Sequence, residues 1–137
     1  MTTFFLARGQ SERDYAYAPL DIVASRSEAI WQAGVNFLIV RRHSSGLASN
    51  LVSNPAPNLA PDRPAIVYVG AAPDLFRFLD NTRCWETAQW KYGADTLLVH
   101  SNLSDASREA ERQDLVAAYT PPMNDDGWLS MIARAFE

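Results

Sequence analysis

The sequence predicts an α+β domain in which a small central antiparallel sheet is flanked by helices and preceded by extra N-terminal strands. Two observations carry this prediction. Apolar runs of strand length occupy 35–42 and 65–69, and segments of helical length begin at capping residues. A chain of 137 residues, 47% of them hydrophobic, is long enough for one such domain and too short for two. We therefore expect 1–137 to form a single domain.

The elements are expected in the following order. Short strands lie at 3–7 and 15–23, and Pro19 confines the second to a sheet edge. One or two helical turns follow between Ser27 and Gly34. The strands at 35–42 and 65–69 pair antiparallel, and a further strand lies at 96–100. The helices expected around these strands cover 73–81, 84–92, 105–119 and, at the C-terminus, 127–136.

A long loop separates the first two central strands. Residues 44–64 include four Pro, four Ser and three Asn, a composition typical of flexible or polyproline-like structure. An insertion of this length does not prevent the flanking strands from pairing, because the entropy of loop closure grows slowly with length. The loop is therefore a candidate contact surface as well as a connection.

Charge and cysteine content limit the classes of function. The net charge of −4 excludes a general polycation for nucleic acid, although it leaves room for a local basic patch. Eleven of the twelve basic residues are Arg, which suits bidentate contacts to phosphate or carboxylate. Cys84 is the single cysteine, and no apolar run approaches the ~20 residues of a membrane span. We expect a cytoplasmic protein with no membrane partner.

Three short motifs occur in a fixed order along the chain. They are Gly34-Val35-Asn36, Tyr68-Val69-Gly70 and, after the helix at 105–119, Pro121-Pro122-Met123-Asn124. Together they resemble the GIY-YIG nuclease superfamily, in particular a compact bacterial and phage branch. The predicted elements follow the order β-β-α-α-β-α after the extra N-terminal strands. The resemblance implies metal-dependent phosphodiester cleavage, with two Tyr, an Arg on the first helix and a Glu on the last helix around the phosphate.

The chain departs from the residues that this resemblance implies. Asn36 stands at the first Tyr, Phe78 at the helix Arg and Arg112 at the helix Glu, so that Tyr68 is the only retained catalytic position. Arg77 and Glu111 each lie one residue early, which rotates a helical side chain by about 100°. We expect Glu111 to be turned away from the centre of the buried face and Arg77 to point away from the core. Neither would then substitute without a helical bulge.

These departures predict a catalytically degenerate GIY-YIG-like domain that acts as a nucleic-acid- or protein-binding module. The candidate binding residues are Arg41, Arg42, Arg108, Arg112 and Tyr68. An anion site is one interpretation of Arg108 and Arg112. The other is that their stems cover the core edge while their heads lie in water. No cofactor and no metal ligand are expected in this case.

Two alternatives stay open. The first is an active, divergent metal-dependent endonuclease that uses Arg77 and Glu111 with Mg²⁺ or Mn²⁺. The second is a phage or bacterial accessory module that binds a protein partner through the loop at 44–64. The remaining conspicuous side chains have structural interpretations: the four Trp, including Trp90, are expected in the core, and His100 has no paired metal-ligand pattern.

Overall fold

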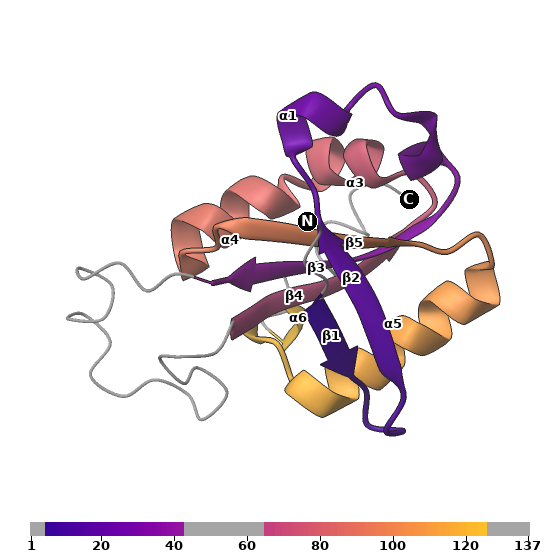
Figure 1. Cartoon of the computed structure of the whole chain (residues 1–137). Helices are drawn as coiled ribbons and strands as arrows, with labels where there is room; N and C mark the ends of the chain where they lie inside the picture. The colour runs from indigo at the N-terminus through magenta and orange to yellow at the C-terminus, as the bar shows by residue number, and fades with distance from the viewer. Residues whose placement is uncertain (1–4, 43–64, 126–137) are drawn as a thin grey trace.

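The computed structural model describes residues 5–42 and 65–125 (Figure 1). The predicted loop at 44–64 and the predicted helix at 127–136 lie outside the described residues. The elements of the described part are β1 (Phe5–Arg8), β2 (Asp14–Pro19), α1 (Ile22–Ser25), the 3-10 helix η1 (Ala29–Gln32), β3 (Val35–Arg41), β4 (Ala65–Ala72), α3 (Leu75–Thr82), α4 (Cys84–Tyr92), β5 (Thr96–Ser101), α5 (Asp105–Tyr119) and α6 (Pro122–Asp125).

All described strands join one antiparallel sheet in the order β1-β2-β5-β3-β4. β3 is the most extensively paired strand, because it lies between β4 and β5 and uses both of its edges. The expected α+β class and the antiparallel pairing of the strands on either side of the loop are therefore confirmed. A register shift between Ile39 and Val40 interrupts the β3–β4 ladder.

The strand expected over 15–23 is wrong in its second half. β2 is not at the sheet edge, because it pairs with β1 through residues 14–17 and with β5 through Ala18 and Pro19. It ends at Pro19, which has no N–H to donate to a neighbouring strand. Two residues later the Asp21 carboxylate accepts hydrogen bonds from the N–H groups of Val23 and Ala24, and α1 begins. The apolar residues after Pro19 thus form a capped helical turn rather than more strand.

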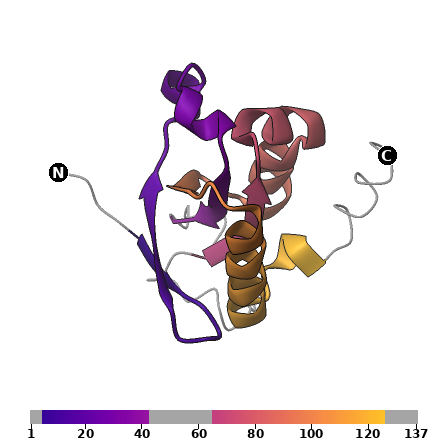
Figure 2. The same cartoon turned by 90° about the vertical axis from the view of Figure 1, so that its right-hand side faces the viewer.

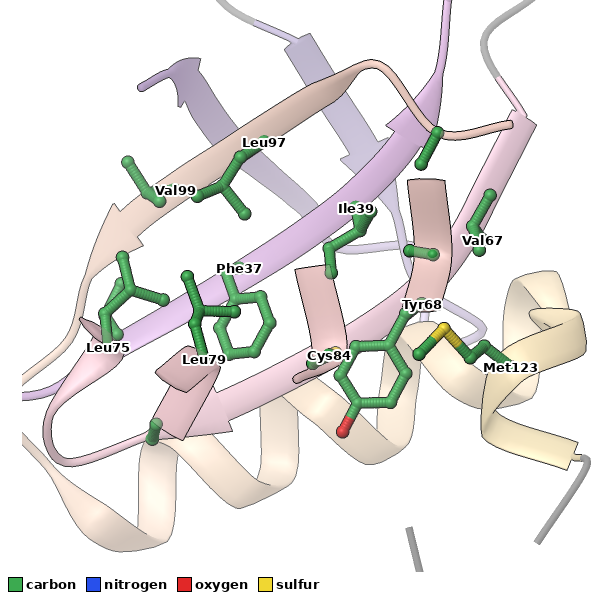
Figure 3. Packing of buried hydrophobic residues seen from close by; sticks show 14 of the residues in the cluster. Phe37, Ile39, Val67, Tyr68, Leu75, Leu79, Cys84, Leu97, Val99 and Met123 are labelled. Atoms are coloured by element: carbon green, nitrogen blue, oxygen red, sulfur yellow. The ribbon is translucent and has the colours of Figure 1, made fainter. Parts of the chain in front are cut away.

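Helices cover both faces of the sheet. Val35, Phe37 and Ile39 point to the face that carries α3 and α4, in the cluster drawn in Figure 3. Leu38 and Val40, which alternate with them along β3, point to the opposite face and pack with the buried side of α5. Figure 1 shows the same arrangement, with α3 and α4 above the sheet and α5 below it.

The helices predicted at 73–81, 84–92 and 105–119 are confirmed, with small shifts at the ends of the first. α3 begins at Leu75 because the carboxylate of Asp74, its N-cap, accepts from the N–H of Arg77. α4 ends at Gly93 in the left-handed conformation, and Ser104 caps α5 through the N–H of Ser107. The turns expected between Ser27 and Gly34 form as η1, with Glu28 rather than Ser27 at the N-cap position.

Two of the quoted motifs have packing roles. A Cβ on Gly70 would lie 2.2 Å from the Phe37 ring, so that the close approach of β4 to this side chain requires glycine. Asn124 in α6 pairs its side-chain amide with the edge of β4. It donates to the Val69 carbonyl at 2.9 Å and accepts from the Val69 N–H at 2.8 Å. Asn124 thus satisfies part of the open edge that β4 presents.

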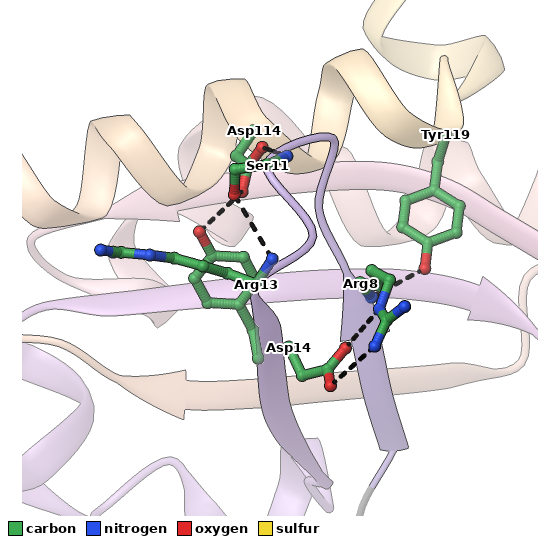
Figure 4. A network of polar contacts seen from close by, with 7 residues as sticks. Arg8, Ser11, Arg13, Asp14, Asp114 and Tyr119 are labelled. Carbon is green, nitrogen blue, oxygen red and sulfur yellow. Dashed lines mark hydrogen bonds and ion pairs between the residues drawn. The ribbon is translucent and has the colours of Figure 1, made fainter.

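The carboxylate of Asp114 holds the β1–β2 hairpin to α5, and the Arg8 N–H also donates to the Tyr119 hydroxyl at 3.0 Å (Figure 4). Asp114 accepts from the Ser11 N–H at 2.8 Å, from the Ser11 hydroxyl at 2.6 Å and from the Tyr15 hydroxyl at 2.8 Å. These hydrogen bonds hold the pKa of Asp114 below its ordinary value. In Figure 2, α5 lies between the hairpin and α6.

None of the described helices has the length and apolar character that crossing a membrane requires.

Candidate functional site

The positions implied by the nuclease resemblance do not converge on one site. Asn36 is fully buried on the α5 face of the sheet, where its amide donates to the Arg108 carbonyl at 3.0 Å. Its side-chain oxygen accepts from the Asn102 amide at 3.1 Å. Phe78 lies on the opposite face and packs on Phe37, with ring centroids 5.5 Å apart. A phosphate cannot contact both positions, because the sheet separates them.

Tyr68 lies on the α3 and α4 face, next to Met123 and Cys84 in Figure 3. Burial raises the pKa of its hydroxyl well above the ordinary value, so that it stays protonated at physiological pH. Arg112 is close enough to Tyr68 for their charges to interact. The half-buried Arg112 guanidinium pairs with Glu109, at 2.9 Å from Nε to Oε2. Tyr68 and Arg112 are therefore the two predicted site residues that the fold brings together.

Arg108 is committed to the interior of the domain. Its side chain is buried, donates from Nη1 to the Asn102 carbonyl at 2.8 Å and pairs with Asp105 through Nη2. Gly34 makes room for it: φ is +122°, and a Cβ there would lie 2.3 Å from Nη1. Arg108 and Arg112 thus each hold a carboxylate of their own helix, one turn apart, and do not form a joint anion site.

The expected orientation of Glu111 is wrong, whereas that of Arg77 is confirmed. Glu111 is only 4% exposed and lies on the buried stripe of α5 with Arg108 and Leu115. Leu115 is four residues after Glu111, a spacing that places both on one helix face and could have indicated the burial. The expectation failed because Val116 and Tyr119 were given equal weight, although both are only half-buried.

Glu111 is held between two aromatic side chains of the sheet. The Tyr17 hydroxyl of β2 donates to Glu111 Oε2, and His100 Nδ1 of β5 lies 3.1 Å from the same oxygen. The His100 nitrogen lacks the alignment of a hydrogen bond. The two rings meet edge to face, with centroids 5.5 Å apart. Burial and the Glu111 charge raise the pKa of Tyr17, which keeps this hydroxyl a donor.

This Tyr17–His100–Glu111 cluster was not predicted. His100 and Asn36 are partners in the β5–β3 register, and Tyr17 lies beside His100 because Ala18 pairs with Val99. A row of polar side chains therefore crosses the sheet beneath α5. The residues come from three separate parts of the chain, and no local spacing connects them. His100 is partly exposed at the side-chain level, so the row reaches solvent there.

Arg41 and Arg42 lie at the end of β3, next to the C-terminal end of α4. Arg41 passes Gly93 closely: a Cβ on this glycine would lie 3.5 Å from Arg41 Cδ. Arg42 is exposed, and its backbone N–H donates to Asp95 at 2.8 Å. Neither guanidinium forms an ion pair with another residue in the described part of the chain.

Trp90 and Lys91 occupy the last turn of α4, just before Gly93. The expectation of a core role is wrong for Trp90, whose side chain is 85% exposed. It lies two residues, or roughly 200°, from the buried Ala88, and so points away from the sheet. Lys91 Nζ lies 5.5 Å from the centroid of the Tyr92 ring. We refer to Arg41, Arg42, Trp90 and Lys91 as the β3–α4 surface.

Within residues 5–42 and 65–125, no group of three or more His, Cys, Asp or Glu side chains is arranged to hold a metal ion. Burial raises the pKa of the Cys84 thiol, as fits a packing residue. Comparison of the chain with protein-family models, with curated proteins and with solved structures finds no match. The nuclease resemblance therefore depends on the three motifs and on the order of elements.

Proposed function

We propose that this chain is a GIY-YIG-like domain that binds nucleic acid through the β3–α4 surface and does not cleave phosphodiesters. The scaffold part of the proposal is supported by the element order from β3 to α5, which is β-β-α-α-β-α as the sequence pattern predicts. It is also supported by the central place of β3 between β4 and β5.

The absence of cleavage is supported by where the family positions lie. Asn36 and Phe78 are on opposite faces of the sheet, and Arg112 is paired with Glu109. Arg77 and Glu111 cannot form the site either, because Arg77 belongs to α3 on one face of the sheet and Glu111 to α5 on the other. A cation and a carboxylate separated by the sheet cannot stabilise charge on the same phosphate.

The observation that carries the binding proposal is the location of Arg41 and Arg42. Arg41 and Arg42 are consecutive residues without carboxylate partners among the described residues, and each offers bidentate donors to phosphate oxygens. The net charge of the whole chain, −4, repels a polyanion, so that binding must be local and sensitive to salt. Arg108 and Arg112, in contrast, have internal partners already.

A paired cleavage and binding experiment tests this proposal. The protein is incubated with supercoiled DNA, single-stranded DNA and RNA in Mg²⁺ or Mn²⁺, and binding is measured by fluorescence anisotropy at low salt. We expect binding without cleavage, and weaker binding in the double variant Arg41→Ala/Arg42→Ala. Arg77→Ala is the matched control, because it removes an exposed Arg from α3. Absence of nucleic-acid binding would refute the proposal and favour a protein partner.

A second candidate, a hydrolase, is favoured by the Tyr17–His100–Glu111 cluster. A buried carboxylate 3.1 Å from Nδ1 of a partly exposed imidazole brings together two groups capable of acid–base chemistry. The same incubation distinguishes it. Cleavage by the unmodified protein that disappears in both Glu111→Gln and His100→Gln would establish this candidate in place of the non-cleaving module.

A further inference from the structure

We infer that the β3–α4 surface selects single-stranded nucleic acid, with Trp90 as the platform on which an unpaired base stacks. The inference deepens the proposed function and rests on it, since it names the form of nucleic acid that the same surface recognises.

The first argument is the exposure of Trp90. An indole normally contributes a large apolar area to a core or an interface, and such residues are rarely left in water. Trp90 is 85% exposed although its helix is well anchored, with Cys84 and Ala88 fully buried on the opposite side. The helix therefore holds the backbone of Trp90 in place, while the indole is open to solvent.

The second argument is the charge around the ring. Lys91 follows Trp90 directly, and Gly93, against which Arg41 packs, is three residues on, which is roughly 4.5 Å along a helix axis. Arg42 continues the basic run beyond Arg41. Two carboxylates lie nearby: Asp95 accepts from the Arg42 N–H and from the Thr96 hydroxyl at 2.9 Å, and Glu86, one turn before Trp90, lies 4.0 Å from Arg83 Nε. Positive charge on the same end of α4 as an exposed aromatic ring matches the combination of phosphate and base in a single strand.

The third argument is geometric. In a duplex both faces of each base are covered by neighbouring bases, so a single indole on a convex helix surface has access only to the backbone and groove edges. An unpaired strand can turn a base onto the ring while its phosphates contact Arg41 and Arg42. Stacking of this kind is tolerant of sequence, because every base has a π-face. We therefore expect selection by strandedness and little selection by sequence.

The test compares labelled oligothymidylate, an unrelated single-stranded sequence and a duplex by fluorescence anisotropy at low salt. For single strands we expect Trp90→Ala to weaken binding about tenfold, within the range measured for base–aromatic stacking, and Trp90→Phe to retain most of the affinity. Duplex binding should be weaker and unchanged in both variants. Val23→Ala is the matched control, because Val23 is also 85% exposed but lies in α1.

The outcomes separate the two proposals. Equal single-strand affinity in Trp90→Ala and the unmodified protein, or a preference for duplex, would overturn the inference. If the Arg41→Ala/Arg42→Ala loss persisted in that case, the proposed function would stand. Absence of binding to any of the three ligands would overturn both. The thermal unfolding of each variant is also measured. A Tm equal to that of the unmodified protein shows that the substitution alters the surface and not the stability of the fold.

Discussion

Replacing Tyr17 by Phe removes one hydroxyl from the polar row beneath α5 and leaves the ring in place. The hydroxyl is the aligned donor to Glu111, a side chain that is only 4% exposed. After the change Glu111 keeps the adjacent His100 but loses this hydrogen bond, and water cannot readily replace it. A hydrogen bond to a charged group contributes about 1.5–3 kcal/mol, so we expect the free energy of unfolding to fall by about 2 kcal/mol.

The assay is urea unfolding of Tyr17→Phe and of the unmodified protein at the same pH, with thermal unfolding as a second readout. For a chain of this length, 2 kcal/mol corresponds to a fall of about 7 °C in Tm. Tyr15→Phe is the matched control, since it removes a hydroxyl from the same strand whose acceptor is the half-exposed Asp114. We expect it to cost about 0.5–1 kcal/mol.

A double-mutant cycle with Glu111→Gln isolates the Tyr17–Glu111 interaction from other effects of each change. We expect a coupling energy of about 1 kcal/mol or more, because Gln retains an acceptor but not the charge. The reasoning fails if Tyr17→Phe costs no more than Tyr15→Phe, or if the two changes are additive.

Three further predictions concern other contacts. Asn124→Ala removes both hydrogen bonds to Val69, and we expect a loss of about 1–3 kcal/mol in urea unfolding; a loss below about 0.5 kcal/mol would contradict the edge-capping role. The lowered pKa of Asp114 contributes stability that is present above the unfolded-state pKa and is lost as pH falls through the folded-state pKa. Asp114→Asn should therefore flatten the acid limb of the stability profile, and an unchanged limb would refute this. Gly70→Ala forces a Cβ toward the Phe37 ring, so we expect a lower Tm, and an unchanged Tm would contradict that packing.

The sheet and its helices could be predicted because their signals are local. The apolar run of β3 and the caps Asp74 and Ser104 each mark an element within a few residues. The strand predicted at 15–23 is too long because Ile22 and Val23 suit a strand as well as a helix. The residue that decides for the helix is Asp21, which caps it.

The candidate site was harder to predict, since it depends on contacts between distant parts of the chain. The burial of Glu111 depends on a hydrogen bond from the Tyr17 hydroxyl, and Tyr17 lies 94 residues away in sequence. Arg108 and Arg112 attract attention as cations, yet the i, i+3 carboxylates Asp105 and Glu109 could have indicated that both would be paired. The exposure of Trp90 could be inferred from its angle to Ala88, had composition not favoured a core Trp.

The salt dependence of DNA binding tests the central claim most directly. For single strands the logarithm of the binding constant falls with the logarithm of salt concentration with a slope of about −0.7 for each phosphate neutralised. The account predicts measurable binding at low salt, with a contribution of about −1.4 to the slope from Arg41 and Arg42 together, and a slope reduced by that amount in Arg41→Ala/Arg42→Ala. Binding whose slope is the same in the double variant, or no binding at low salt, would contradict it.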